Sequence, residues 1–114
     1  MADDHEFDFW LGTWDLTWGE NGRGTNQIQR ILNGRVIEEH FRGNEPELEG
    51  ISHSVLSEED SRWHQTWVDD SGGYLDFVGE FADGRMILSR DGIAQGQLVR
   101  QRMVWYNITE NALE

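Results

Sequence analysis

The sequence predicts an all-β protein: an antiparallel up-and-down meander of strands that closes into a single barrel. Short runs of alternating apolar and polar residues recur at roughly ten-residue spacing, and turn dipeptides separate them. No stretch of about twelve residues shows the apolar stripe of a helix. A chain of 114 residues suffices for one domain, 1–114, with its own core.

The predicted strands cover 13–20, 24–32, 35–43, 50–57, 61–69, 74–81, 85–91 and 97–109. Asn21-Gly22, Asn33-Gly34 and Asp83-Gly84 fit type I′ hairpin turns, because these turns need positive φ at both central residues. Before the first strand, 7–11 is too rich in apolar residues for a surface tail. We expect this segment to form a short helical plug at one end of the barrel.

The turns also predict which side chains share a face. A two-residue loop at Asn33-Gly34 pairs Gln27 with His40, and a symmetric loop after it pairs His40 with His53. The turn at Glu59-Asp60 can then set Val55 beside Trp63, and a change of one residue there would exchange the faces of the later strands. The apolar residues expected in the interior are Ile31, Val36, Ile51, Val55, Trp63, Trp67, Leu75, Phe77 and Phe81.

Six polar side chains fall on the same predicted face: Gln27, Gln29, Glu38, His40, His53 and Gln65. A buried polar group without a partner costs about 1–3 kcal/mol, so a core built only for stability would not collect them. Either they hydrogen-bond one another, or they bond water and a ligand in a cavity. We therefore expect a barrel that holds a small molecule.

The charge is strongly acidic, with 22 Asp and Glu against nine basic residues, all of them Arg, and a formal net charge of −13. Such a surface repels phosphate groups, so nucleic acid and anionic membranes are not expected as partners. The chain has no Cys, which excludes a disulfide, a thiolate nucleophile and a sulfur metal site. Its acidic start and lack of a long apolar run predict a cytoplasmic protein.

Gly12-Thr13-Trp14, at the start of the first strand, resembles the glycine–any residue–tryptophan pattern of lipocalins and other calycins. That resemblance implies that Trp14 closes the barrel floor and that an arginine from the last strand, Arg100 or Arg102, packs over it as a cation–π contact.

Three longer segments, 7–14, 31–43 and 63–69, resemble a family of small calycin-like bacterial domains of unknown function. The resemblance runs over essentially the whole chain and implies the barrel fold, but it supplies no activity or catalytic residue. Such domains usually continue with another turn and a final strand or two, whereas this sequence ends at Ala112-Leu113-Glu114. Eight strands can close unaided; otherwise two chains complete each other's sheets, and we expect a homodimer.

The opening 11–14 also resembles nitrobindin-type haem barrels, which take their iron-ligating His from late in a longer chain. Every His here lies at or before residue 64, so no haem or other cofactor is expected.

The leading hypothesis is a ligand site lined by Trp14, Gln27, His40, His53, Trp63, Gln65, Trp67 and Phe77, with Arg100 and Arg102. The alternative is an enzyme in which Glu38, His40 and His53 act in acid–base chemistry or hold Zn²⁺ or Fe²⁺, with Glu39 replacing Glu38 if the register shifts. A hydrogen-bonded His pair is the simpler interpretation, so no metal site is predicted. The third hypothesis is a structural module with a packed interior, whose product is the dimer.

Overall fold

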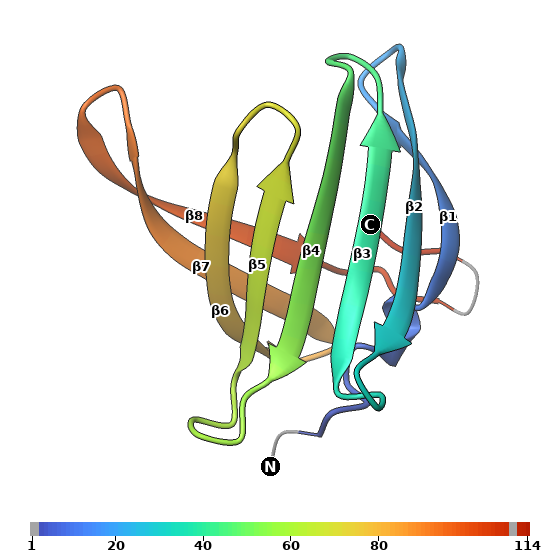
Figure 1. Cartoon of the computed structure of the whole chain (residues 1–114), viewed down its shortest axis with the longest axis vertical. Coiled ribbons are helices and arrows are strands. Elements are labelled where there is room, and N and C mark those ends of the chain that lie inside the picture. Colours follow the sequence, from blue (N-terminus) through green and yellow to red (C-terminus); the bar gives the residue numbers. More distant parts are fainter. Residues whose placement is uncertain (1–2, 110–111) are drawn as a thin grey trace.

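The computed structural model describes residues 3–109 and 112–114, which form one antiparallel sheet after a short 3-10 turn, η1 (Asp8–Trp10) (Figure 1). The strands are β1 (Gly12–Trp18), β2 (Gly22–Ile31), β3 (Val36–Gly43), β4 (Leu48–Leu56), β5 (Trp63–Asp69), β6 (Tyr74–Ala82), β7 (Arg85–Ala94) and β8 (Gln97–Trp105). They follow one another in the sheet in sequence order. The predicted all-β, eight-strand antiparallel meander is confirmed. In the described part of the chain, no helix is long and apolar enough to cross a membrane.

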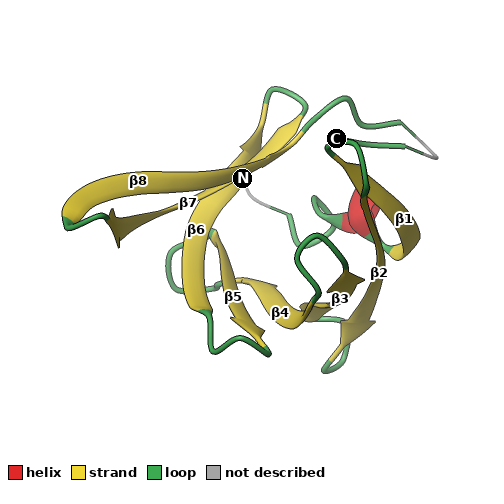
Figure 2. Cartoon of the chain, turned by 90° about the horizontal axis from the view of Figure 1, so that it is seen from above, coloured by secondary structure: helices red, strands yellow, loops and turns green. Residues whose placement is uncertain are grey.

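The sheet curls strongly but does not close into a barrel, so the predicted closure is wrong. Within the described ranges, β1 pairs only with β2 and β8 only with β7. The pairing of β6 with β7 covers only Val78–Ala82 on β6, and Figure 2 shows the β7–β8 hairpin extending away from the open curl. Closure needs the last strand to be carried round to the first, and this divergence prevents it.

The segment before β1 forms no helical plug, because its regular structure is limited to the 3-10 turn η1. It is nevertheless docked: Phe7 and Trp10 are buried. Arg30 on β2 holds the segment from the sheet side, donating hydrogen bonds to the carbonyl of Asp4 at 2.8 Å and to a carboxylate oxygen of Asp8. The segment therefore covers one end of the curled sheet.

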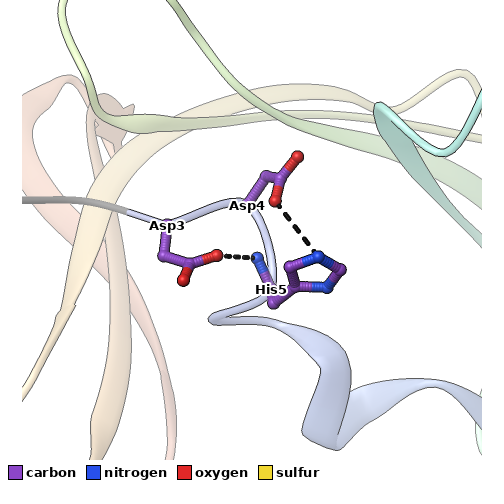
Figure 3. A group of neighbouring side chains, drawn as sticks. All are labelled: Asp3, Asp4 and His5. Atoms are coloured by element: carbon purple, nitrogen blue, oxygen red, sulfur yellow. Dashed lines mark hydrogen bonds and ion pairs between the residues drawn. The ribbon is translucent and has the colours of Figure 1, made fainter.

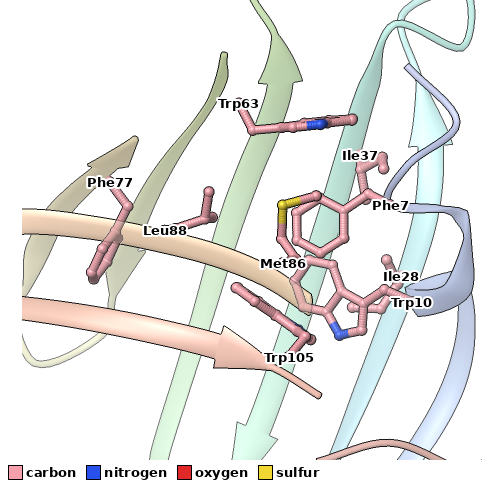
Figure 4. Close-up of a cluster of buried hydrophobic side chains, with 9 residues drawn as sticks. All are labelled: Phe7, Trp10, Ile28, Ile37, Trp63, Phe77, Met86, Leu88 and Trp105. Atoms are coloured by element: carbon pink, nitrogen blue, oxygen red, sulfur yellow. The ribbon is translucent and has the colours of Figure 1, made fainter. Parts of the chain in front are cut away.

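The hydrophobic core lies at this covered end (Figure 4). The Phe7 ring is at its centre, with its centroid 4.9 Å from that of Trp10, 5.3 Å from Trp63 and 5.0 Å from Trp105. These rings join the N-terminal segment to β5 and β8. The buried apolar residues are Phe7, Trp10, Ile28, Ile37, Trp63, Phe77, Met86, Leu88 and Trp105.

The register confirms the first predicted pairings and corrects the later ones. Gln27 pairs with His40 as predicted. His40 then pairs with Ile51 rather than His53, a shift of two residues that leaves the faces unchanged. Val55 pairs with His64 rather than Trp63, and this shift of one residue exchanges the faces.

The cause of the exchange is the loop between β4 and β5. The Ser57 N–H bonds the Arg62 carbonyl at 2.9 Å, and Ser61 adopts the left-handed conformation with φ of 59°. The loop therefore sets Leu56 opposite Trp63. As a result, Trp63 and Trp67 of β5 and Phe77 and Phe81 of β6 share their face with Glu39 and the serines of β4, not with the histidines.

Candidate functional site

Five polar side chains lie side by side on the concave face of the sheet, and we call them the polar band: Asn26, Glu39, Ser52, Ser54 and Gln65. The register places Glu39 opposite Ser52 and Ser54 opposite Gln65. Asn26 is 5% exposed, and Ser52, Ser54 and Gln65 are 2% exposed or less. This is an unusual concentration of buried polar groups, because such side chains are mostly exposed in folded proteins.

Hydrogen bonds link most of the polar band internally. Ser52 Oγ donates to Glu39 Oε1 at 2.6 Å, and Asn26 Nδ2 donates to Glu39 Oε2 at 2.8 Å. Gln65 Nε2 donates to Ser54 Oγ at 2.9 Å. The carboxylate of Glu39 can only accept hydrogen bonds, so it accepts one from the NH₂ group of Asn26. The amide oxygen of Asn26 therefore needs a different donor. That oxygen, Asn26 Oδ1, is buried and has no partner.

Glu39 is the titratable group of the polar band. Burial raises the pKa of its carboxyl above the ordinary value of 4.5, and the hydrogen bonds from Ser52 and Asn26 oppose the rise without cancelling it. Among the ion pairs of the described chain, none involves Glu39. The carboxyl is therefore held by neutral donors alone, in surroundings that favour its protonated form.

An aromatic shelf, made of Trp18, Phe41 and Trp67, lies on the concave face beyond the polar band. Phe41 is central, with its ring centroid 6.1 Å from Trp18 and 6.0 Å from Trp67. The rings lie against bare backbone: a Cβ at Gly43 would be 2.7 Å from the Trp18 ring, and one at Gly50 would be 2.2 Å from the Trp67 ring. All three residues are only partly buried, so part of the shelf is exposed to solvent.

Asp69 fixes the Trp67 end of the shelf. Its carboxylate accepts hydrogen bonds from the hydroxyl of Ser71 at 2.6 Å, from Trp67 Nε1 at 2.8 Å and from the backbone N–H of Gly73 at 2.9 Å. These bonds lower the pKa of Asp69 to about 2. One carboxylate thus orders the β5–β6 turn and orients the Trp67 indole.

The predicted histidine site is not formed, because His40 and His53 lie on the convex face with side chains 48% and 51% exposed. His53 Nε2 is 3.0 Å from Glu38 Oε2, whereas His40 Nε2 is 2.9 Å from Glu49 Oε2. The two rings therefore have different carboxylate partners. The pKa of the Glu38 carboxyl is lowered, and the largest cause is its hydrogen bond with His53. The hydrogen bond from Gln29 is the next largest cause. The predicted placement of these histidines, and of exposed Gln27, in the interior is wrong.

The strand register places five of the predicted site residues on the concave face: Trp14, Trp63, Gln65, Trp67 and Phe77.

Arg100 and Arg102 are not part of that face's polar band. Both are exposed and lie on β8, which is not a neighbour of β1 in the sheet. Arg100 donates to Asp91 Oδ1 at 3.2 Å and to Ser89 Oγ at 2.9 Å. The stacking of a β8 arginine on Trp14, which the calycin resemblance implies, is thus replaced by contacts within the β7–β8 hairpin.

Sequence reasoning missed Asn26, Ser52 and Ser54, and it considered Glu39 only for a shifted register. One signal was available. A glycine inside a strand marks the face on which a bulky group approaches closely. Gly50 lies in a strand that pairs with the one carrying Trp67, so its face is the aromatic face. Ser52 and Ser54, two and four residues later, share that face.

A separate group near the start of the chain, Asp3, Asp4 and His5, is close enough to hold a cation, with ligand atoms within 4.8 Å of one another (Figure 3). Two of these residues are exposed. His5 Nδ1 already lies 2.9 Å from Asp8 Oδ2, and this hydrogen bond is the largest cause of the raised pKa of His5. The cluster is thus explained by contacts within the N-terminal segment.

The sequence matches no protein-family model and none of the curated proteins. The resemblance to calycin-like domains is therefore supported by the eight-strand antiparallel meander alone.

Replacing Glu39 with glutamine is expected to make the free energy of unfolding less sensitive to pH. Between 4.5 and the raised pKa, the folded protein binds more protons than the unfolded chain, so ionisation of Glu39 destabilises the fold as pH rises. Glu39→Gln keeps a hydrogen-bond acceptor and removes that ionisation. Urea unfolding at a series of pH values measures this effect. Above pH 4.5 the free energy of unfolding of the variant should rise relative to that of the wild type, and the difference should become constant above the raised pKa.

Glu38→Gln is the matched control, because the adjacent carboxyl has the opposite shift. A lowered pKa contributes stability that is present above 4.5 and is lost as pH falls. This variant should therefore lose stability relative to the wild type at neutral pH and converge with it in acid. If the two variants follow the same pH profile, Glu39 is not buried as described.

Proposed function

We propose that the concave face binds a small organic molecule, with the polar band as its hydrogen-bonding site and the aromatic shelf as its apolar wall. One observation supports this most directly: Asn26 Oδ1 is a buried acceptor without a partner, beside the buried carboxyl of Glu39. Leaving such a group unsatisfied costs about 1–3 kcal/mol. A ligand N–H or O–H would offset that cost.

The composition of the face also favours a ligand. Small-molecule sites are lined mainly by apolar and aromatic side chains, with a few placed polar groups that fix orientation. The register places Trp14 and Phe41 on either side of Asn26, and Trp67 beside Ser52. All three rings are partly exposed. Aromatic surface and one unsatisfied polar atom, Asn26 Oδ1, thus adjoin one another on the concave face.

An enzyme is the second candidate, and Glu39 is the residue that favours it. A carboxyl whose pKa is raised by burial keeps its proton to higher pH than an exposed carboxyl, which favours a role as a general acid. The histidines that sequence reasoning assigned to this role lie on the other face.

The predicted homodimer stays a prediction. The outer edges of β1 and β8 carry no partner strand in the described part of the chain. Ile93 and Leu98, paired across the β7–β8 hairpin, are 77% and 78% exposed.

Titration of tryptophan fluorescence tests the binding proposal. The probes are fatty acids, flavins, haem, small carboxylates and phenylalkyl alcohols, added to the wild type, Asn26→Ala and Gln27→Ala. Asn26 belongs to the polar band, whereas its neighbour Gln27 is exposed on the convex face. We expect at least one probe class to shift or quench the emission of the wild type. Its affinity should fall about tenfold in Asn26→Ala, equivalent to one lost hydrogen bond, and remain unchanged in Gln27→Ala.

If no probe changes the emission, or if both variants weaken binding equally, the concave face is not the binding site.

A further inference from the structure

The polar band presents oxygen acceptors to a ligand around Asn26 and Glu39. Glu39 accepts one hydrogen bond on each carboxylate oxygen, from Ser52 and from Asn26, and each oxygen can accept more. Asn26 Oδ1 adds a third acceptor, which is buried and unpartnered. Three acceptor oxygens from two adjacent strands thus lie in one group, and one of them has no protein donor.

The two arginines on the concave side of the sheet are engaged elsewhere, so neither neutralises these acceptors. Arg30 donates to the carbonyls of Gly34 at 2.5 Å and Asp4 at 2.8 Å. Arg90 donates from Nη1 to Gln101 Oε1, and its Nε, which is buried without a hydrogen-bond partner, lies 3.6 Å from Asp76 Oδ1. A carboxylate buried without a positive partner is costly. A ligand that carries positive charge would remove that cost.

The aromatic residues around the acceptors complete a site that suits a cation. Trp14 and Phe41 are the register neighbours of Asn26 on β1 and β3, and Trp67 is the neighbour of Ser52 on β5. The faces of aromatic rings carry partial negative charge and attract ammonium and guanidinium groups. The net charge of −13 further concentrates cations around the protein.

We propose that the ligand of the concave site is an organic cation, a primary amine or amidine joined to an apolar or aromatic body. This inference rests on the proposed function and names the ligand class for that same site. The charged head donates hydrogen bonds to Glu39 and Asn26 Oδ1, and the body lies along the aromatic shelf. Hydrogen bonds between charged partners are roughly twice as strong as neutral ones, which gives the head its selectivity.

Calorimetric titration with three probes of similar size tests the ligand class: 2-phenylethylamine, 2-phenylethanol and 3-phenylpropanoate. At about 0.15 M salt, where weak surface attraction is screened, we expect the amine to bind the wild type about tenfold more tightly than the alcohol. The propanoate should bind more weakly than either. This comparison needs no variant, so it decides the proposal even if a substitution prevents folding.

Glu38→Gln and Glu39→Gln then separate the site from general surface charge, because each removes one formal negative charge from adjacent positions on opposite faces. The preference for the amine should vanish in Glu39→Gln and persist in Glu38→Gln. Equal loss in both variants, or equal affinity of the wild type for amine and alcohol, overturns the cation proposal. If the alcohol or propanoate binds best and Asn26→Ala abolishes its binding, the proposed function stands and only the ligand class is wrong.

Discussion

Gly79→Ala is expected to destabilise the protein by about 3 kcal/mol or more, at the upper end of what overpacking costs. Gly79 lies in the middle of β6, paired with Trp63 on one side and Leu88 on the other. A Cβ at this position would be 1.8 Å from the carbonyl oxygen of Ile87 and 2.9 Å from the Cα of Leu88. These are backbone atoms, so they can yield only if β6 and β7 separate.

The consequence of separating these strands extends beyond one pair of residues. The β6–β7 pairing is short, covering Val78–Ala82 on β6, and it is the connection that holds the β7–β8 hairpin to the rest of the sheet. That hairpin supplies Met86, Leu88 and Trp105 to the core. Loss of the pairing would therefore remove core residues as well as hydrogen bonds. A domain with a total stability of roughly 5–15 kcal/mol would have little left.

Urea unfolding followed by far-UV circular dichroism measures the effect, and Gly92→Ala provides the control on the neighbouring strand. A Cβ at Gly92 would be 2.7 Å from Arg90 Nη1 and 3.0 Å from Gln101 Oε1. Both atoms are at the ends of flexible side chains, which can move at little cost. We expect a small change for Gly92→Ala and a large loss, or no folded protein, for Gly79→Ala. Equal stability of the two variants would contradict the close contact of β6 with β7.

The sequence was sufficient to predict the meander but not its closure. Alternation within each strand and the Asn-Gly and Asp-Gly turns are local signals, and the pairing of β2 with β3 about Asn33-Gly34 follows from them. Closure requires β8 to reach β1. Whether it does depends on the twist and divergence accumulated over every strand pair. No local pattern encodes the departure of the β7–β8 hairpin beyond Ser89.

The candidate site depended on a single turn. The loop from Ser57 to Arg62 can be joined in two registers that differ by one residue, and the left-handed conformation of Ser61 selects the observed one. Serine is not a residue that signals positive φ. This difference changes the candidate site. In the observed register Glu39 and Ser52 lie on the aromatic face, whereas His40 and His53 lie exposed on the opposite face.

Phe7→Ala is the second large effect, with an expected loss of about 3–5 kcal/mol, the usual range for truncating a buried phenylalanine. The side chain is fully buried, and its ring contacts Trp10, Trp63 and Trp105, with centroids within 5.3 Å of its own. Truncation leaves a cavity between the N-terminal segment and the sheet. Because η1 is only three residues long, it has no stability of its own to keep the segment in place.

Tyr74→Ala is the matched control, because Tyr74 is an aromatic residue at the start of β6 that is 62% exposed. It should lose less than about 1 kcal/mol, as surface substitutions do. Near-UV circular dichroism adds a second measurement, because the packed Trp10, Trp63 and Trp105 rings lose their fixed environment if the segment detaches. If Phe7→Ala unfolds at the same urea concentration as Tyr74→Ala and keeps the near-UV signal of the wild type, the residues before β1 do not form part of the core.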